Sequence, residues 1–200
     1  MGRFSFALFG VALLASTGCG SSITIVRQAV PNPFRGGASF ALMPLDVQGM
    51  TIDGMPPQAW LARNNRDGVN LDSDLADAQS LFAAGVRNVA PDAIAGVGQR
   101  FVVHTHVGAW ARGYYNYFTN PPTTVSLNVQ LTTAEGQVLD EIWLQCRAYH
   151  SLTRPTPVQG LRVAMQDCGE QLGRYLQQRR IALLRRSRAL ASAGTAHDAL

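Results

Sequence analysis

The 200-residue sequence predicts an α+β fold, a two-layer sandwich in which two helices cover one face of a mainly antiparallel sheet of about four strands. Residues 123–133 and 138–150 alternate apolar and polar side chains on either side of the turn "AEGQ", as antiparallel strands with one wet face do. Residues 72–89 and the segment after Pro157 carry apolar residues at helical spacing. The predicted order is β-α-β-β-β-α, within a domain over residues 38–178.

Two strands and one helix precede the hairpin. The apolar run "SFALMPL" at 39–45 suits a short buried strand, and "RFVVHTHVGA" at 100–109 suits the strand before the hairpin. Between them, residues 72–89 start with Asp72 or Ser73 as the capping residue and with acids in the first turn, and a proline follows their end. These are the boundaries of a helix.

The last helix has the clearest start signal. Thr156, Pro157 and Gln159 provide a capping residue, a proline at the first helical position and a capping-box partner. Apolar residues then recur along one stripe: Leu161, Met165, Cys168, Leu172 and Leu176. We expect a basic helix extension and a disordered tail over residues 179–200.

Composition excludes several functions. All 17 basic residues are arginines, so a Walker-type, Schiff-base or general-base lysine cannot exist. Six of these arginines lie in residues 174–188 and the rest of the domain is slightly acidic, so the basic pI predicts no nucleic-acid partner. The sequence contains no G-x-S-x-G, H-E-x-x-H, C-x-x-C or P-loop motif. We expect no catalytic residue and no cofactor, and an enzyme without a recognisable motif is the last alternative.

The amino terminus has the pattern of a secretion signal. Residues 1–18 contain one arginine, the hydrophobic stretch "FSFALFGVALLAS" and then small residues. A stretch of about a dozen residues is too short to span a bilayer but suits a signal-peptide core. We predict a signal peptide over residues 1–18 and a lipidated, flexible tether over residues 19–37, which contain several Ser, Pro and Gly residues.

The end of this signal, "LLASTGC", resembles the bacterial lipobox. Thr17 and Gly18 fit the positions before the cysteine, whereas Ser16 departs from the usual Leu. The resemblance implies cleavage before Cys19 and lipidation of that residue, each buried CH₂ contributing roughly 0.8 kcal/mol to membrane binding. Because Gly20 rather than Asp follows, it also implies an outer-membrane anchor facing the periplasm. The alternatives are a secreted protein cut near Gly18 or Gly20, or an uncleaved anchor.

Lipidation of Cys19 would leave an even pair of cysteines in an oxidising compartment. Cys146 lies on the apolar face of the last predicted strand, and Cys168 lies on the apolar stripe of the last helix. Both therefore point into one sheet–helix interface, which predicts a disulfide between them. Two buried free thiols are the alternative.

The element order and the hairpin "VSLNVQLTTAEGQVLDEIW" resemble a broad group of bacterial envelope lipoproteins, including the amino-terminal domain of TolB and the curli-secretion lipoprotein. The resemblance covers residues 38–178 and the lipobox, and it brings no catalytic motif. It implies a small periplasmic α/β domain. We expect a non-enzymatic outer-membrane lipoprotein that binds or scaffolds an envelope partner in a transport, secretion or assembly system.

Aromatic residues are the first candidates for contact with a partner. Trp110, Tyr114, Tyr115 and Tyr117 lie in an aromatic segment between two strands, and rigid aromatic side chains favour protein contacts. The alternative is that half of the aromatic residues fold back over the hairpin and the rest are merely exposed. Trp143 would stand on the wet face of the sheet among polar residues: His104, His106, Ser126, Asn128, Gln130, Gln145 and Arg147.

Two further surfaces come from the charged and histidine side chains. A basic face could lie on anionic lipid or on a partner, or could be a solvated helix end: Arg179, Arg180, Arg185 and Arg186. His104 and His106 share one strand face, but zinc needs a third and usually a fourth ligand. We predict no metal, and a small-ligand or metal-binding module at these two histidines is the alternative function.

Replacing Cys19 by serine tests the lipoprotein interpretation. We expect the wild-type chain to incorporate labelled palmitate and the Cys19→Ser variant to incorporate none, because serine offers no thiol for lipid transfer. A Cys146→Ser variant is the matched control and should be labelled like the wild type. Labelling that survives in the Cys19→Ser chain would contradict lipidation at this residue.

Overall fold

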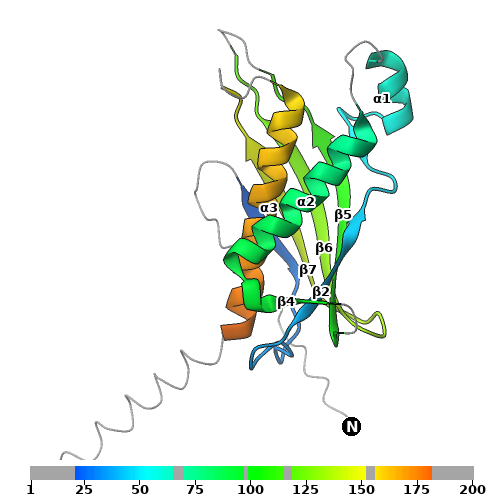
Figure 1. The fold of residues 1–200 in the computed structure, drawn as a ribbon. Helices are drawn as coiled ribbons and strands as arrows, with labels where there is room; N and C mark the ends of the chain where they lie inside the picture. The colour runs from blue at the N-terminus through cyan, green and yellow to red at the C-terminus, as the bar shows by residue number, and fades with distance from the viewer. Residues whose placement is uncertain (1–20, 65–69, 97–98, 115–118, 152–155, 182–200) are drawn as a thin grey trace, which may run out of the picture.

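The computed structural model describes residues 21–64, 70–96, 99–114, 119–151 and 156–181 (Figure 1). Its strands are β1 (Ser22–Arg27), β2 (Phe40–Asp46), β3 (Thr51–Ile52), β4 (Ile94–Ala95), β5 (Phe101–Ala111), β6 (Thr123–Thr133) and β7 (Val138–Ala148). Its helices are α1 (Pro57–Asn64), α2 (Leu71–Val89), α3 (Pro157–Ile181) and the short 3-10 helix η1 (Pro91–Ala93).

The sheet is mixed, with the strand order β1-β7-β6-β5-β2-β4, and β3 pairs with β5 beyond the end of β2. The strands β1, β7, β6 and β5 are antiparallel neighbours, whereas β2 is parallel to both β5 and β4. The fold class is α+β, but the prediction of about four antiparallel strands with two helices is wrong. The described residues form a seven-stranded mixed sheet and three α-helices.

The parallel pairing follows from the connection between β2 and β5. Parallel neighbours require a crossover of a dozen residues or more, and the segment that carries α1 and α2 supplies one. The sequence predicted a strand, a helix and a strand here without assigning the pairing. Strands β3 and β4 have two residues each, which is too short for side-chain alternation to indicate them.

Strand β1 lies within the segment that was predicted to be a flexible tether. It pairs antiparallel with β7, so that Ile23 meets Leu144 and Ile25 meets Ile142 on the core side of the sheet. The tether prediction is therefore wrong for Ser22–Arg27. The strand is six residues long and precedes a Pro- and Gly-rich run, and its partner lies more than a hundred residues later in the chain.

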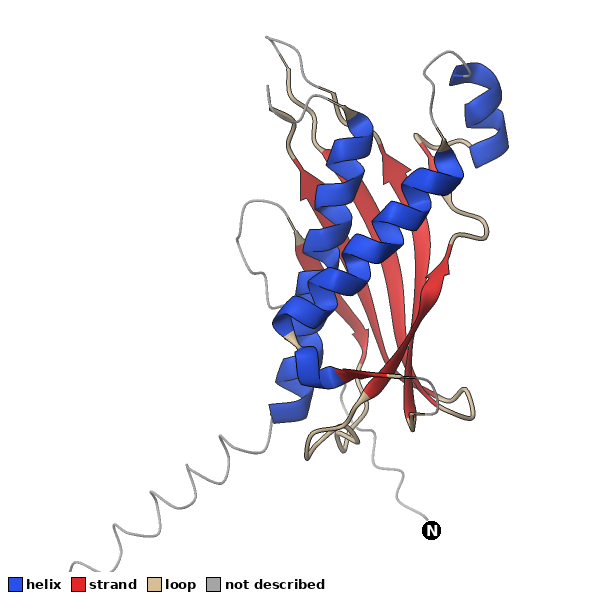
Figure 2. Cartoon of the chain, viewed as in Figure 1, coloured by secondary structure: helices blue, strands red, loops and turns tan. Residues whose placement is uncertain are grey.

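Helices α2 and α3 lie together on one face of the sheet (Figures 1 and 2). Their backbones meet at glycines. A Cβ atom added to Gly85 would lie 2.3 Å from the carbonyl oxygen of Gln166, and one added to Gly169 would lie 2.1 Å from that of Phe82. No side chain fits in this contact, so the helix pair depends on both glycines.

The cap of α3 is confirmed and that of α2 is not. The Gln159 N–H donates to Thr156 Oγ1 and the Thr156 N–H donates to Gln159 Oε1, each at 3.3 Å, which is a reciprocal capping box. Helix α2 is capped by Asn70, whose side chain accepts from the Ser73 N–H, rather than by Asp72 or Ser73. Asn, Asp and Ser cap helices about equally well, so residue type does not distinguish Asn70 from Asp72 or Ser73.

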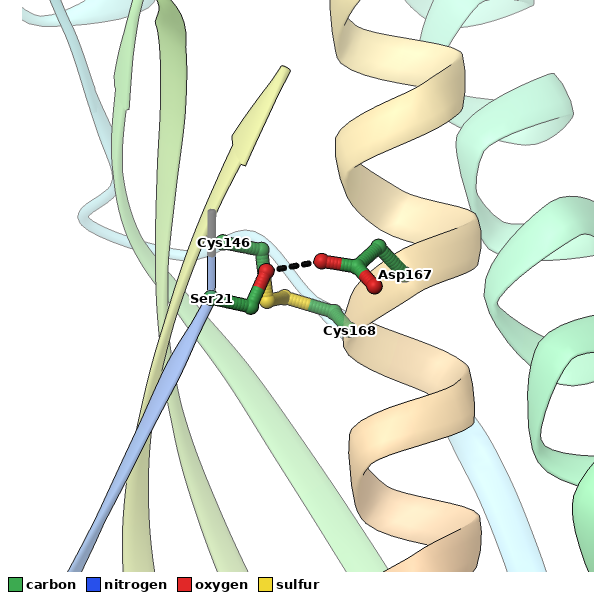
Figure 3. The surroundings of a disulfide bond; sticks show 4 residues. All are labelled: Ser21, Cys146, Asp167 and Cys168. Atoms are coloured by element: carbon green, nitrogen blue, oxygen red, sulfur yellow. Dashed lines mark hydrogen bonds between the residues drawn. A yellow bond between two sulfur atoms is a disulfide. The ribbon is translucent and has the colours of Figure 1, made fainter. Parts of the chain in front are cut away.

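The disulfide between Cys146 and Cys168 is present, with the two sulfur atoms 2.04 Å apart (Figure 3). It joins β7 to the middle of α3, and both cysteines are fully buried. Beside it, the Ser21 hydroxyl donates a hydrogen bond to Asp167 of α3. The prediction from the shared sheet–helix interface is confirmed.

A buried ion pair holds the carboxyl-terminal end of α3. Arg179 donates to Asp140 of β7 through Nε (2.7 Å) and through a terminal nitrogen (3.0 Å). The backbone N–H of Ala29 also donates to Asp140, at 2.8 Å, and Arg179 donates to the Ala29 carbonyl, at 3.1 Å. Asp140 is fully buried and Arg179 nearly so. The pair therefore joins the amino-terminal segment, the sheet and α3.

Arg179 was predicted to lie on an exposed basic face, and that prediction is wrong. Arg179 follows the buried Leu172 and Tyr175 along the inner stripe of α3. There it contacts the Asp140 carboxylate of β7. The Tyr175 hydroxyl donates to the same carboxylate at 2.6 Å. Burial and the neighbouring Asp140 raise the pKa of Tyr175, so this hydroxyl keeps its proton and remains a donor.

Removing the carboxylate of this cluster should destabilise the protein strongly. In Asp140→Ala the Arg179 charge stays buried without its carboxylate, which costs about 3–5 kcal/mol in the free energy of unfolding. Arg174→Ala is the matched control, because its pair with Glu170 lies at the surface of the same helix and should contribute less than about 0.5 kcal/mol. Urea denaturation measures both, and equal losses would contradict this assignment.

Candidate functional site

The face of the sheet opposite the helices carries the candidate site. No helix among the described residues covers it, and we call it the open face (Figure 2). It presents the polar set expected from the alternation: His104, His106, Ser126, Asn128, Gln130, Trp143, Gln145 and Arg147. The alternating buried residues of these strands, among them Val103, Leu127 and Leu144, lie in the core beneath α2 and α3.

The strand register aligns one row of side chains across the open face. Asp46 of β2 pairs with His106 of β5, His106 with Asn128 of β6, Asn128 with Trp143 of β7, and Trp143 with Thr24 of β1. Strands lie about 4.8 Å apart, so the row is roughly 20 Å wide. The sequence indicated His106, Asn128 and Trp143 as residues of one sheet face, but only the pairing of five strands places all five residues in line.

Hydrogen bonds orient several of these polar groups. His106 Nδ1 lies 3.2 Å from Asp46 Oδ2. Asn128 donates to Glu141 Oε1 at 2.7 Å, and Arg147 donates to Gln145 Oε1 at 3.2 Å. These contacts restrain the side chains before any partner arrives, which lowers the entropy cost of binding them.

Trp143 is the large apolar group of the open face, and 49% of it is exposed. Its neighbours in the register are Thr24 and Asn128, both polar. A tryptophan that stands among hydrogen-bonding groups offers apolar contact area and an N–H donor to the same partner.

Trp110 is not part of an exposed aromatic segment, and that prediction is wrong. It lies inside β5, is 1% exposed, and its ring packs 6.4 Å from the ring of Trp60. A bulge between Val107 and Ala109 shifts the alternation by one residue and turns Trp110 into the core. Tyr114 is exposed as predicted. Tyr115 and Tyr117 lie outside the described residues.

The remaining predicted residues divide between the surface and the undescribed segments. Arg180 is half-buried and donates to the Gly37 carbonyl at 3.4 Å. Cys19, Arg185 and Arg186 lie outside the described residues. Within the part of the chain that the structure describes, no helix is long and apolar enough to cross a membrane.

His104 and His106 share the open face, as the alternation predicts. Among the described residues, however, no three His, Cys, Asp or Glu side chains are grouped to hold a metal ion. His150 is buried against Thr123, with His150 Nε2 and Thr123 Oγ1 2.9 Å apart, and does not reach these histidines. The acidic neighbour of His106 is Asp46, whose contact with His106 is an ion pair or hydrogen bond.

Comparison with known proteins finds distant likenesses. No protein-family model and no curated protein matches the chain. Among solved structures, the PelC dodecamer from Paraburkholderia phytofirmans is 12% identical, with 76% of this chain and 97% of that chain covered and a TM-score of 0.41. A DUF330 protein from Xanthomonas campestris is 12% identical, with 74% and 90% covered and a TM-score of 0.46.

The hypothetical protein CT253 from Chlamydia trachomatis is 10% identical, with 70% of this chain and 98% of that chain covered and a TM-score of 0.42. The resemblance to these bacterial proteins is weak, since each TM-score is below 0.5. TolB and the curli-secretion lipoprotein are not among the three structures, so that finer resemblance stays a prediction.

The pairing of Asp46 with His106 is testable by titration. The Gln48 backbone N–H and, to a smaller extent, His106 lower the pKa of Asp46 below its ordinary value of 3.8. The stability that Asp46 contributes above pH 3.8 is therefore lost as the pH falls through the lowered pKa. In His106→Ala the pKa of Asp46, followed by NMR, should rise part of the way back to 3.8.

His104→Ala is the matched control for this titration, because His104 shares the open face but pairs with Gln130 in the register. It should leave the pKa of Asp46 unchanged. An equal rise in both variants would show that the effect is a general change in charge rather than the contact with His106.

Proposed function

We propose that the protein is a non-enzymatic outer-membrane lipoprotein whose periplasmic domain binds another envelope protein through the open face. It would serve as a binding or scaffolding component of a transport, secretion or assembly system. The observation that carries the proposal is the row across five strands with the half-exposed Trp143 near one end.

The shape of the open face supports a macromolecular partner. Small-molecule sites are concave and bury most of their ligand, whereas this surface is a sheet face with side chains standing on it. A row roughly 20 Å wide, with one large aromatic residue among oriented polar groups, has the composition of a protein interface. Tyr114, Tyr115 and Tyr117 remain further proposed contacts.

The proposed compartment has separate support. A disulfide is stable in an oxidising compartment such as the periplasm, and this chain has one between a core strand and a core helix. The lipobox-like segment before Cys19 supports the anchor. The resemblance of the hairpin to TolB and to the curli-secretion lipoprotein supports the same location, and we propose this relationship as well.

Site-specific photo-crosslinking in intact cells tests the open face. A benzophenone amino acid at position 143 should give a discrete crosslinked product, whereas the same group at Gln177, exposed on α3, should not. In chemically crosslinked membranes, Trp143→Ala should reduce recovery of that partner at least tenfold, since a hot-spot tryptophan contributes about 2 kcal/mol or more. Equal crosslinking at both positions, or unchanged recovery, would overturn the proposal.

A further inference from the structure

The folded domain begins almost at the proposed lipid attachment point. The Ser21 hydroxyl donates a hydrogen bond to Asp167 of α3 (Figure 3), and β1 begins at Ser22. Only Gly20 lies between Cys19 and Ser21. The tether expected from the sequence is thus replaced by a link of one or two residues.

So short a link restricts where the domain can be. Two extended residues span at most about 7 Å. The headgroup layer of one leaflet is itself about 5–7 Å thick. A lipid on Cys19 would therefore hold the start of β1 at the level of the headgroups, and the domain could not move away from the bilayer.

Three exposed apolar side chains lie along the β1 edge of the domain, toward the end of β1 that is farther from Ser21. Val26 is on β1, Val30 follows β1 and is 90% exposed, and Ile181 ends α3. Val30 and Ile181 are in the same corner, because the Asn32 side chain donates to the Arg179 carbonyl at 2.7 Å. We call these residues, with the adjacent Arg27 and Arg180, the β1 corner.

The chemistry of the β1 corner fits a membrane surface. Exposed valine and isoleucine side chains can enter the boundary between headgroups and acyl chains, and arginines beside them suit the phosphates. If the domain were free in solution, Val30, which is 90% exposed, would leave almost all of its apolar area in water.

We infer that the folded domain rests directly on the bilayer that anchors it, with the β1 corner in contact with the headgroups. The inference depends on the proposed lipidation of Cys19. It places the sheet edge-on to the membrane, with β1 toward the lipid and the β2–β4 edge away from it (Figure 1). In this orientation the open face stands clear of the bilayer and stays accessible to a partner.

Quenching by brominated lipid tests the contact. The full-length lipidated protein is reconstituted in phosphatidylcholine–phosphatidylglycerol vesicles with brominated acyl chains, in a Trp143→Phe background. The background keeps the buried Trp60 and Trp110, so the signal of an added tryptophan is taken as the difference from the background protein. That signal should fall by half or more in Val30→Trp, because a side chain at the corner would lie within about 5–10 Å of the acyl boundary. Val47→Trp is the matched control, since Val47 is an exposed valine beyond β2 at the opposite edge, and should stay unquenched.

Flotation of the same vesicles separates the two proposals. If the protein floats with the vesicles and Val30→Trp is quenched while Val47→Trp is not, the inferred orientation is supported. If it floats and Val30→Trp is not quenched, or both variants are quenched equally, the orientation is overturned while the lipid anchor stands. If it does not float, the anchor is overturned and the inferred contact with it.

Discussion

The buried pair of Asp140 and Arg179 is the interaction on which the arrangement of the chain depends. Burying two charges is costly, and the pair is favourable here because its contact is bidentate and Tyr175 and the Ala29 backbone satisfy further bonding positions. It ties the amino-terminal segment to β7 and α3 at one point. The ion pair therefore fixes the position of the segment that follows β1.

A second constraint lies eleven residues earlier on α3, where Cys168 is bonded to Cys146. The two attachments are roughly 16 Å apart along the helix at 1.5 Å per residue. Fixed at both points, α3 can neither slide along β7 nor rotate about its axis. Helix α2 then packs on α3 through glycine contacts, so both long helices occupy one face of the sheet and leave the other open.

The proposed anchor and the proposed binding surface are compatible because of where β1 lies. As the edge strand, β1 can face the bilayer while the row from Asp46 to Trp143 remains exposed on the face beside it. A long flexible tether would allow any orientation. If Cys19 carries the proposed lipid, the short link to β1 makes the orientation of the domain a property of the fold.

The sequence by itself determined what depends on neighbouring residues: the alternating hairpin of β6 and β7, the helices α2 and α3, the capping box at Thr156, and the shared interface that predicted the disulfide. Tertiary structure decided the rest. β1 needed a partner far along the chain, one bulge in β5 reversed the direction of Trp110, and a buried carboxylate drew Arg179 into the core. Periodicity records a local backbone state, whereas pairing, bulges and buried charges are set by residues distant in sequence.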